Sequence, residues 1–87
     1  MAVYMVERSL PGIGMDALGD AQKKAIETGA RMRSAGTDVR YIRTTFAPDD
    51  GRCMCLFEAV DEAAVRRLNE DAGIPFNRIV PAMDLTP

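Results

Sequence analysis

Histidine is absent from the 87 residues of this chain, and so is tryptophan. Histidine is the commonest general acid or base near neutral pH and a frequent neutral metal ligand. Its absence also excludes the Ser-His and Cys-His pairs that activate many nucleophiles. Any chemistry must therefore use carboxylates, thiols, tyrosine, lysine or arginine.

The chain also lacks an excess of positive charge and a long apolar run. It has 13 acidic and 11 basic residues, a formal charge of −2, and 6% aromatic residues. A chain with this charge has no basic surface to bind a phosphate backbone. It also has too few aromatic side chains to stack nucleic-acid bases. No apolar run approaches the roughly 20 residues of a membrane span, and charges interrupt the N-terminal segment where a signal peptide would be apolar. We therefore expect a cytoplasmic protein that binds neither nucleic acid nor membrane.

The segments that are present alternate between two periodicities. Strands are expected at 3–8, 39–46, 52–59 and 76–85, and helices at 15–35 and 60–73. Asp61 is the expected N-cap of the second helix and Gly73 its stop, while Pro81 favours an edge position for the last strand. The order βαββαβ predicts a single α+β domain over 1–87: a ferredoxin-like, four-stranded antiparallel sheet with two helices on one face. If the other face is apolar, a second copy of the chain is its simplest cover.

The first helix has apolar positions that recur every three or four residues. These positions are Leu18, Ala21, Ala25, Ile26, Gly29 and Met32. That spacing predicts one buried helical face. Since Gly29 costs helix stability, we expect it to mark a close approach of the helix to the sheet.

Both cysteines, Cys53 and Cys55, lie in strand 52–59, where alternation places them on one face. One interpretation is two small buried residues. Another is a metal pair completed by carboxylates such as Glu7 or Glu58, or by a second subunit, because no other thiol or imidazole exists. A functional disulfide is disfavoured, since same-face neighbours on one strand lie roughly 6.5–7 Å apart, at the long end of the disulfide range.

The alternation also predicts which residues face away from the helices. We expect the two cysteines there, with Val3, Met5 and Glu7 of the first strand and Val39, Tyr41, Arg43 and Thr45 of the second. The complementary sets are more uniformly apolar and are expected beneath the helices: Tyr4, Val6, Ile42, Phe46, Met54 and Leu56.

The segments YMVERSLPGI and YIRTTFAPDDGRCMCLFEAVDEAAVRRLNEDAGIPFNRIVPA closely resemble a family of small bacterial domains of unknown function. Its best-known members are nickel-binding, ferredoxin-like proteins. The resemblance implies a homodimer with an α/β-barrel-like body, a cavity between the two sheets, and nickel as the cofactor to consider. Cys55 matches the cysteine of the family pattern in CLFEA. The relatives usually carry a histidine in the second helix where this chain has Asn69, which cannot replace an imidazole on nickel.

Three functions follow from these observations. The first is a homodimer that binds a small ligand or a metal ion in a cavity at the sheet face, with Cys55 and Glu58 as the metal ligands. That cavity is expected to be lined by Glu7, Tyr41, Thr45, Cys55, Glu58 and Asn69. The second is a cofactor-free enzyme, a cyclase or oxygenase of the dimeric α/β-barrel kind, with Glu7 or Glu58 as general base and Tyr41 as hydrogen-bond donor. The third is an accessory dimer with no site.

The enzyme interpretation requires a general base with a particular pKa. A carboxylate in that role needs a pKa raised by burial. Pairing of Glu7 with Arg43, or full exposure of its carboxylate to solvent, would count against it.

Overall fold

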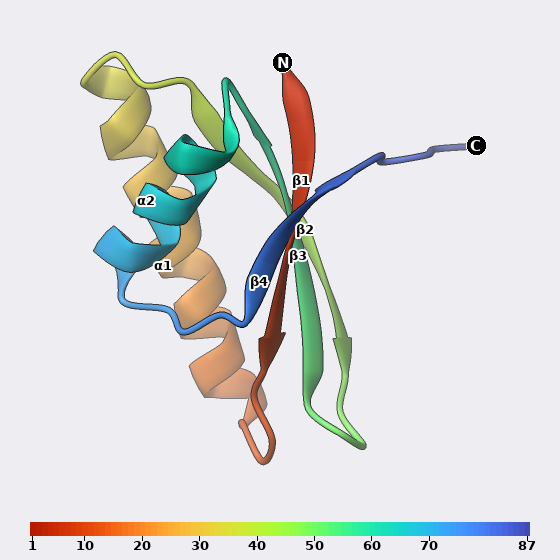
Figure 1. Ribbon diagram of the computed structural model, residues 1–87. Helices are drawn as coiled ribbons and strands as arrows, with labels where there is room; N and C mark the ends of the chain where they lie inside the picture. The colour runs from red at the N-terminus through yellow and green to blue at the C-terminus, as the bar shows by residue number, and fades with distance from the viewer.

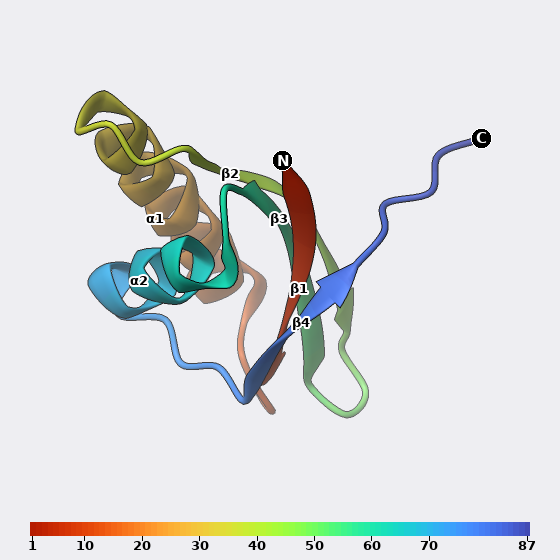
Figure 2. The ribbon, with the colours of Figure 1, turned by 45° about the horizontal axis from the view of Figure 1, so that its top comes forward.

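The computed structural model describes residues 1–87 and has six elements in the expected order (Figure 1). They are β1 (Ala2–Ser9), α1 (Met15–Ser34), β2 (Val39–Ala47), β3 (Arg52–Ala59), α2 (Glu62–Ala72) and β4 (Arg78–Ala82). Neighbouring strands pair antiparallel, and their order across the sheet is β2-β3-β1-β4. Both helices cover the same face of the sheet (Figures 1 and 2). The ferredoxin-like βαββαβ fold is thereby confirmed.

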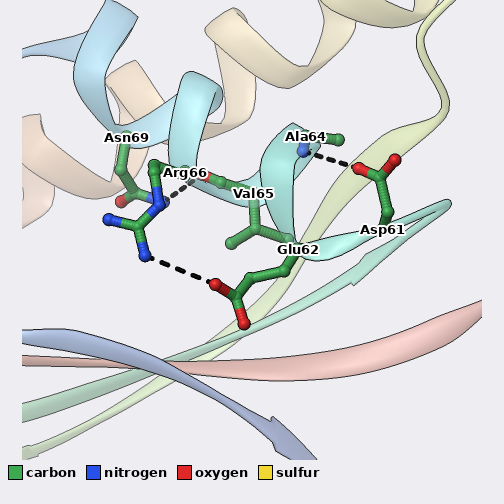
Figure 3. A network of polar contacts seen from close by, with 6 residues as sticks. All are labelled: Asp61, Glu62, Ala64, Val65, Arg66 and Asn69. Atoms are coloured by element: carbon green, nitrogen blue, oxygen red, sulfur yellow. Dashed lines mark hydrogen bonds and ion pairs between the residues drawn. The ribbon is translucent and has the colours of Figure 1, made fainter.

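The ends of α2 follow from two residues that the sequence singles out. The side chain of Asp61 accepts a hydrogen bond of 2.9 Å from the backbone N–H of Ala64, which confirms it as the N-cap (Figure 3). Gly73 ends the helix with φ at 70°, in the left-handed region that glycine enters at little cost. β4 is an edge strand, as Pro81 predicts, although it is shorter than expected.

The buried face of α1 carries small residues where the helix crosses the sheet and α2. A Cβ placed on Gly29 would lie 3.3 Å from Cδ1 of Leu68 and 3.5 Å from the carbonyl oxygen of Val39. The predicted close approach is therefore confirmed. The inclusion of Ile26 in this face is wrong, because Ile26 is 48% exposed and Thr28 is buried in its place.

The expectation that the cysteines line the open face of the sheet is wrong. Cys53, Cys55 and Phe57 are buried on the helix-covered face, and Val6 and Arg8 lie opposite the two cysteines on β1. Met54 and Leu56 consequently lie on the open face. Both faces of β3 are apolar, so the degree of apolarity could not distinguish them.

A β-bulge in β2 explains a second error of face assignment. Tyr41 lies opposite Phe57, but Arg43 lies opposite Leu56, so Ile42 is an extra residue that shifts the alternation. Val39 and Tyr41 before the bulge lie on the helix side, contrary to expectation. Arg43 and Thr45 after the bulge lie on the open side, as expected.

The open face has an apolar centre and a polar margin. The apolar centre consists of Val3, Met5, Met54, Leu56, Val80 and Ala82 on β1, β3 and β4. Met5 lies opposite both Leu56 and Val80, and Val3 lies opposite Ala82. The chain after β4 leaves the sheet on the side away from the helices (Figures 1 and 2), and there Asp84 forms an ion pair of 3.0 Å with Arg43 of β2. Neither helix is long and apolar enough to cross a membrane.

Candidate site between α1 and the sheet

A cavity of about 240 Å³ lies between the first turns of α1 and the ends of β1, β2 and β3. Its apolar and small lining residues are Leu10, Met15, Leu18, Gly19, Ala21, Ala25, Phe46 and Ile74. Its polar and sulfur-bearing lining residues are Arg8, Gln22, Tyr41, Thr44, Cys53 and Cys55. Phe57, Leu68 and Val65, three of the largest fully buried side chains, do not line the cavity.

One wall of the cavity is a chain of hydrogen-bonded side chains from three elements. Nε2 of Gln22 on α1 donates to the hydroxyl of Tyr41 at 2.9 Å. That hydroxyl lies 2.6 Å from Oγ1 of Thr44, which lies 3.1 Å from Sγ of Cys55. The ring of Tyr41 packs edge-on against Phe57, with 5.7 Å between the ring centroids, which orients the phenol. Hydroxyl groups can reverse their donor and acceptor roles, so this wall can either donate to a ligand or accept from it.

Arg8 enters the same cavity from β1 and is 5% exposed. Its NH2 group donates to Oδ1 of Asn69 at 2.9 Å, and its NH1 group donates to the carbonyl oxygen of Pro75 at 3.2 Å. Asn69 is itself buried and fixed by a 2.9 Å hydrogen bond from its amide to the carbonyl of Val65 one turn earlier (Figure 3). The position of the guanidinium is therefore set by α2 and by the loop that follows it.

The thiol of Cys53, beneath α1, stays protonated at neutral pH. Burial, followed by the proximity of Cys55, raises the pKa of Cys53 from 9.0 to about 11. The guanidinium of Arg8 interacts with Cys53 and acts in the opposite direction, but its effect is the smaller one. The thiolate is the form that attacks electrophiles and binds metals. Cys53 is therefore unreactive at neutral pH.

The structure divides the six predicted ligand-binding residues between two faces. Tyr41 and Cys55 line the cavity, and Asn69 orients Arg8 beside it. The other three, Glu7, Thr45 and Glu58, have cross-strand neighbours on the open face. The six residues therefore do not form one site, and the proposed metal ligands Cys55 and Glu58 lie on opposite faces of β3.

Sequence reasoning missed Arg8, although the sequence contains a signal for it. Tyr4, Val6 and Arg8 alternate along β1, so the arginine belongs to the helix-covered face of its strand. An arginine on an otherwise apolar strand face is unusual, because arginine is almost never fully buried unless it is paired. That pattern alone marks Arg8 for attention.

Glu7 has a partner that argues against a role as general base. It forms an ion pair with Arg78, its cross-strand neighbour on β4. The Glu7 carboxylate is occupied by this guanidinium and does not line the cavity. The partner is Arg78 and not the expected Arg43, which pairs with Asp84, but the pairing counts against the enzyme interpretation in the same way.

Fold and cavity together define a small ferredoxin-like α+β protein with an internal, mostly apolar pocket. Residues 4–81 match the family described as Nickel responsive protein SCO4226-like, and the chain belongs to that family. The chain is also similar to the crystal structure of SCO4226 from Streptomyces coelicolor A3(2), with a TM-score of 0.82 and 23% sequence identity. The match covers 98% of this chain and 100% of the other, and at that identity it supports the fold alone. No curated protein sequence matches the chain.

The family description raises the question of whether these residues fit a nickel ion. The chain has no histidine, and no three or more of its cysteine, aspartate and glutamate side chains are grouped so that they could hold a metal. Its thiols are buried, and the pKa of Cys53 is well above neutral. The donors within one chain therefore do not fit a nickel site.

Proposed function

We propose that this protein binds a small organic molecule in the cavity between α1 and the sheet. The observation that carries the proposal is the hydrogen-bonded wall of Gln22, Tyr41, Thr44 and Cys55, which borders an otherwise apolar space. Ligand pockets are typically of this kind, mostly apolar with a few placed polar groups. An apolar cavity of about 150 Å³ is large enough for benzene, so about 240 Å³ suits a ring with a polar substituent.

The position of Gly19 supports access to the cavity from solvent. Gly19 lines the cavity and is exposed, and a Cβ added to it would meet nothing within 4 Å. Gln22, one turn further along α1, is also exposed and lines the cavity. The first turns of α1 therefore form the entrance.

Substitution of Gly19→Leu tests the proposal because the new side chain would occupy the entrance. The probe is neutral benzamide, and the readouts are thermal unfolding and the amide NMR shifts of Thr44 and Cys55. Benzamide at about ten times its Kd should stabilise the wild type by about 1.4 kcal/mol, which corresponds to a rise of several degrees in Tm. The rise should be absent in Gly19→Leu.

The matched control is Ala30→Leu, an exposed position of α1 outside the cavity. It should respond to benzamide as the wild type does, and nickel chloride should produce no comparable stabilisation in any of the three proteins. An equal benzamide response in Gly19→Leu would place binding elsewhere. The absence of a response in the wild type to benzamide and to benzoate, each at millimolar concentration, would count against the proposal.

We also propose that the protein functions as a homodimer through the open face of the sheet. Three observations support this assembly: the apolar centre of that face, the small size of the chain, and the apolar side chains after β4. Met83 and Leu85 are 79% and 82% exposed on a segment that extends away from its own domain (Figure 2). An 87-residue chain buries only roughly 60–65% of its unfolded surface, so its stability as a monomer is small. Burial of the open face in a dimer would increase that stability.

A further inference from the structure

The charge of Arg8 has no anionic partner in this structure. The four ion pairs of the protein join other residues, and none includes Arg8. The two hydrogen bonds of its guanidinium go to an amide oxygen and a backbone carbonyl, both neutral. Buried charges in proteins are normally paired, because removing an ion from water costs several kcal/mol that neutral acceptors repay only in part.

Two neighbouring groups could in principle balance this charge, and neither does so fully. The C-terminal end of α2 carries a partial negative charge of roughly one half, and Pro75 lies just beyond that end. Cys53 lies opposite Arg8 on β3, but its pKa of about 11 keeps the thiol neutral at physiological pH. A net positive charge therefore remains at the cavity.

We infer that the ligand of this cavity is a small organic acid whose carboxylate is bound by Arg8. This inference rests on the proposed function of the cavity and specifies its ligand class. The guanidinium has more N–H donors than its two hydrogen bonds use, and it suits the geometry of a carboxylate. Leu10, Leu18 and Phe46 then contact the apolar body of the acid, and the hydroxyls of Tyr41 and Thr44 are available to a polar substituent.

A pair of isosteric probes separates charge from shape. Benzoate and benzamide differ mainly in charge, and cyclohexanecarboxylate and its amide form a second pair with a non-aromatic body. In titration calorimetry on the wild-type protein at neutral pH, each acid should bind at least about ten times more tightly than its amide, as expected for a charge-assisted hydrogen bond. This comparison requires no variant to fold.

Substitution of Arg8 then assigns the preference to one residue. Arg8→Met should abolish the preference for the acid while retaining amide binding, and Arg8→Lys should restore part of it because the positive charge is kept. Arg67→Met is the matched control, because Arg67 is exposed on α2 and does not line this cavity. It should leave both affinities unchanged.

The remaining outcomes distinguish this inference from the proposed function. Equal binding of acid and amide to the wild type would overturn the role of Arg8 and leave a neutral ligand site, with Arg8 serving only to fix the end of α2. A preference for the acid that survives in Arg8→Met would place the anion elsewhere and likewise overturn it. Failure of all four probes at millimolar concentration would overturn both proposals.

Discussion

At the residue scale, the surroundings of β3 keep the thiol of Cys53 protonated. Burial is the largest cause of its raised pKa, followed by the proximity of Cys55. The unfolded chain exposes the same thiol to water, where it ionises near its usual pKa of 9.0. Folding stability must therefore depend on pH in the range between these two values.

The sign of this dependence follows from the protons bound in each state. Below pH 9 both states keep the proton, so Cys53 has no effect on the pH dependence. Between about pH 9 and about pH 11 the unfolded state loses the proton that the folded state retains, so the free energy of unfolding falls as pH rises. In urea titrations over this range, Cys53→Ala should show a shallower decline than the wild type. Parallel declines would show that Cys53 does not contribute.

The misplacement of the cysteines has a cause at the same scale. Alternation along β3 correctly grouped Cys53 with Cys55 and Phe57, but it could not say which group faces the helices. Leu56 and Met54 are as apolar as a core requires, and they occupy the open face instead. Only Arg8, on the same side as the cysteines, would have indicated that this face holds a cavity as well as a core.

At the scale of elements, α1 shows how the same residue type can serve opposite purposes. Gly19 has open space where its Cβ would lie, whereas Gly29 is in contact with α2 and β2. A glycine in a helix interior costs roughly 0.5–1 kcal/mol relative to alanine. At Gly29 the missing side chain allows α1 to pack closely against α2 and β2. At Gly19 the missing side chain leaves the proposed cavity entrance open.

Alanine at the two positions should change stability in opposite directions. Gly19→Ala should raise the free energy of unfolding by about 0.5–1 kcal/mol, because it adds helix propensity without a contact. Gly29→Ala should lower it by up to about 2 kcal/mol. The new methyl group would lie only 3.3 Å from Cδ1 of the fully buried Leu68, and this crowding, which costs about 1–3 kcal/mol, outweighs the gain in helix propensity. Denaturant midpoints of the two variants measure both effects. Stabilisation by both substitutions would contradict the close contact at Gly29.

Most element boundaries could be predicted because local signals fix them. Asp61 and Gly73 delimit α2, and the turn residues at 48–51 join β2 to β3. The bulge at Ile42 could not be predicted, because a single extra residue leaves no mark in an apolar, β-rich segment. Its consequence is large, since it directs Tyr41 into the cavity and Arg43 to the open face.

At the scale of the whole molecule, the two faces of the sheet differ in character. The helix-covered face holds the cavity and the thiols, and the open face presents an apolar centre with charged neighbours. The expected site combined residues of both faces because it assumed one cavity at a dimer interface. The structure places the cavity and the open face on opposite sides of the sheet, so the proposed ligand binding and the proposed dimerisation can be tested independently.

Leu56→Asp should dissociate the proposed dimer, because it places a charge in the apolar centre of the open face, opposite Met5. Ile26→Asp is the matched control, since Ile26 is 48% exposed on α1, which lies on the other face of the sheet. Sedimentation velocity at micromolar concentration should show a dimer for the wild type and for Ile26→Asp, and a monomer for Leu56→Asp. Because the cavity lies on the opposite face, monomeric Leu56→Asp should still bind benzamide if it remains folded by circular dichroism. A monomeric wild type, or a Leu56→Asp variant that stays dimeric, would show that the open face is not the interface.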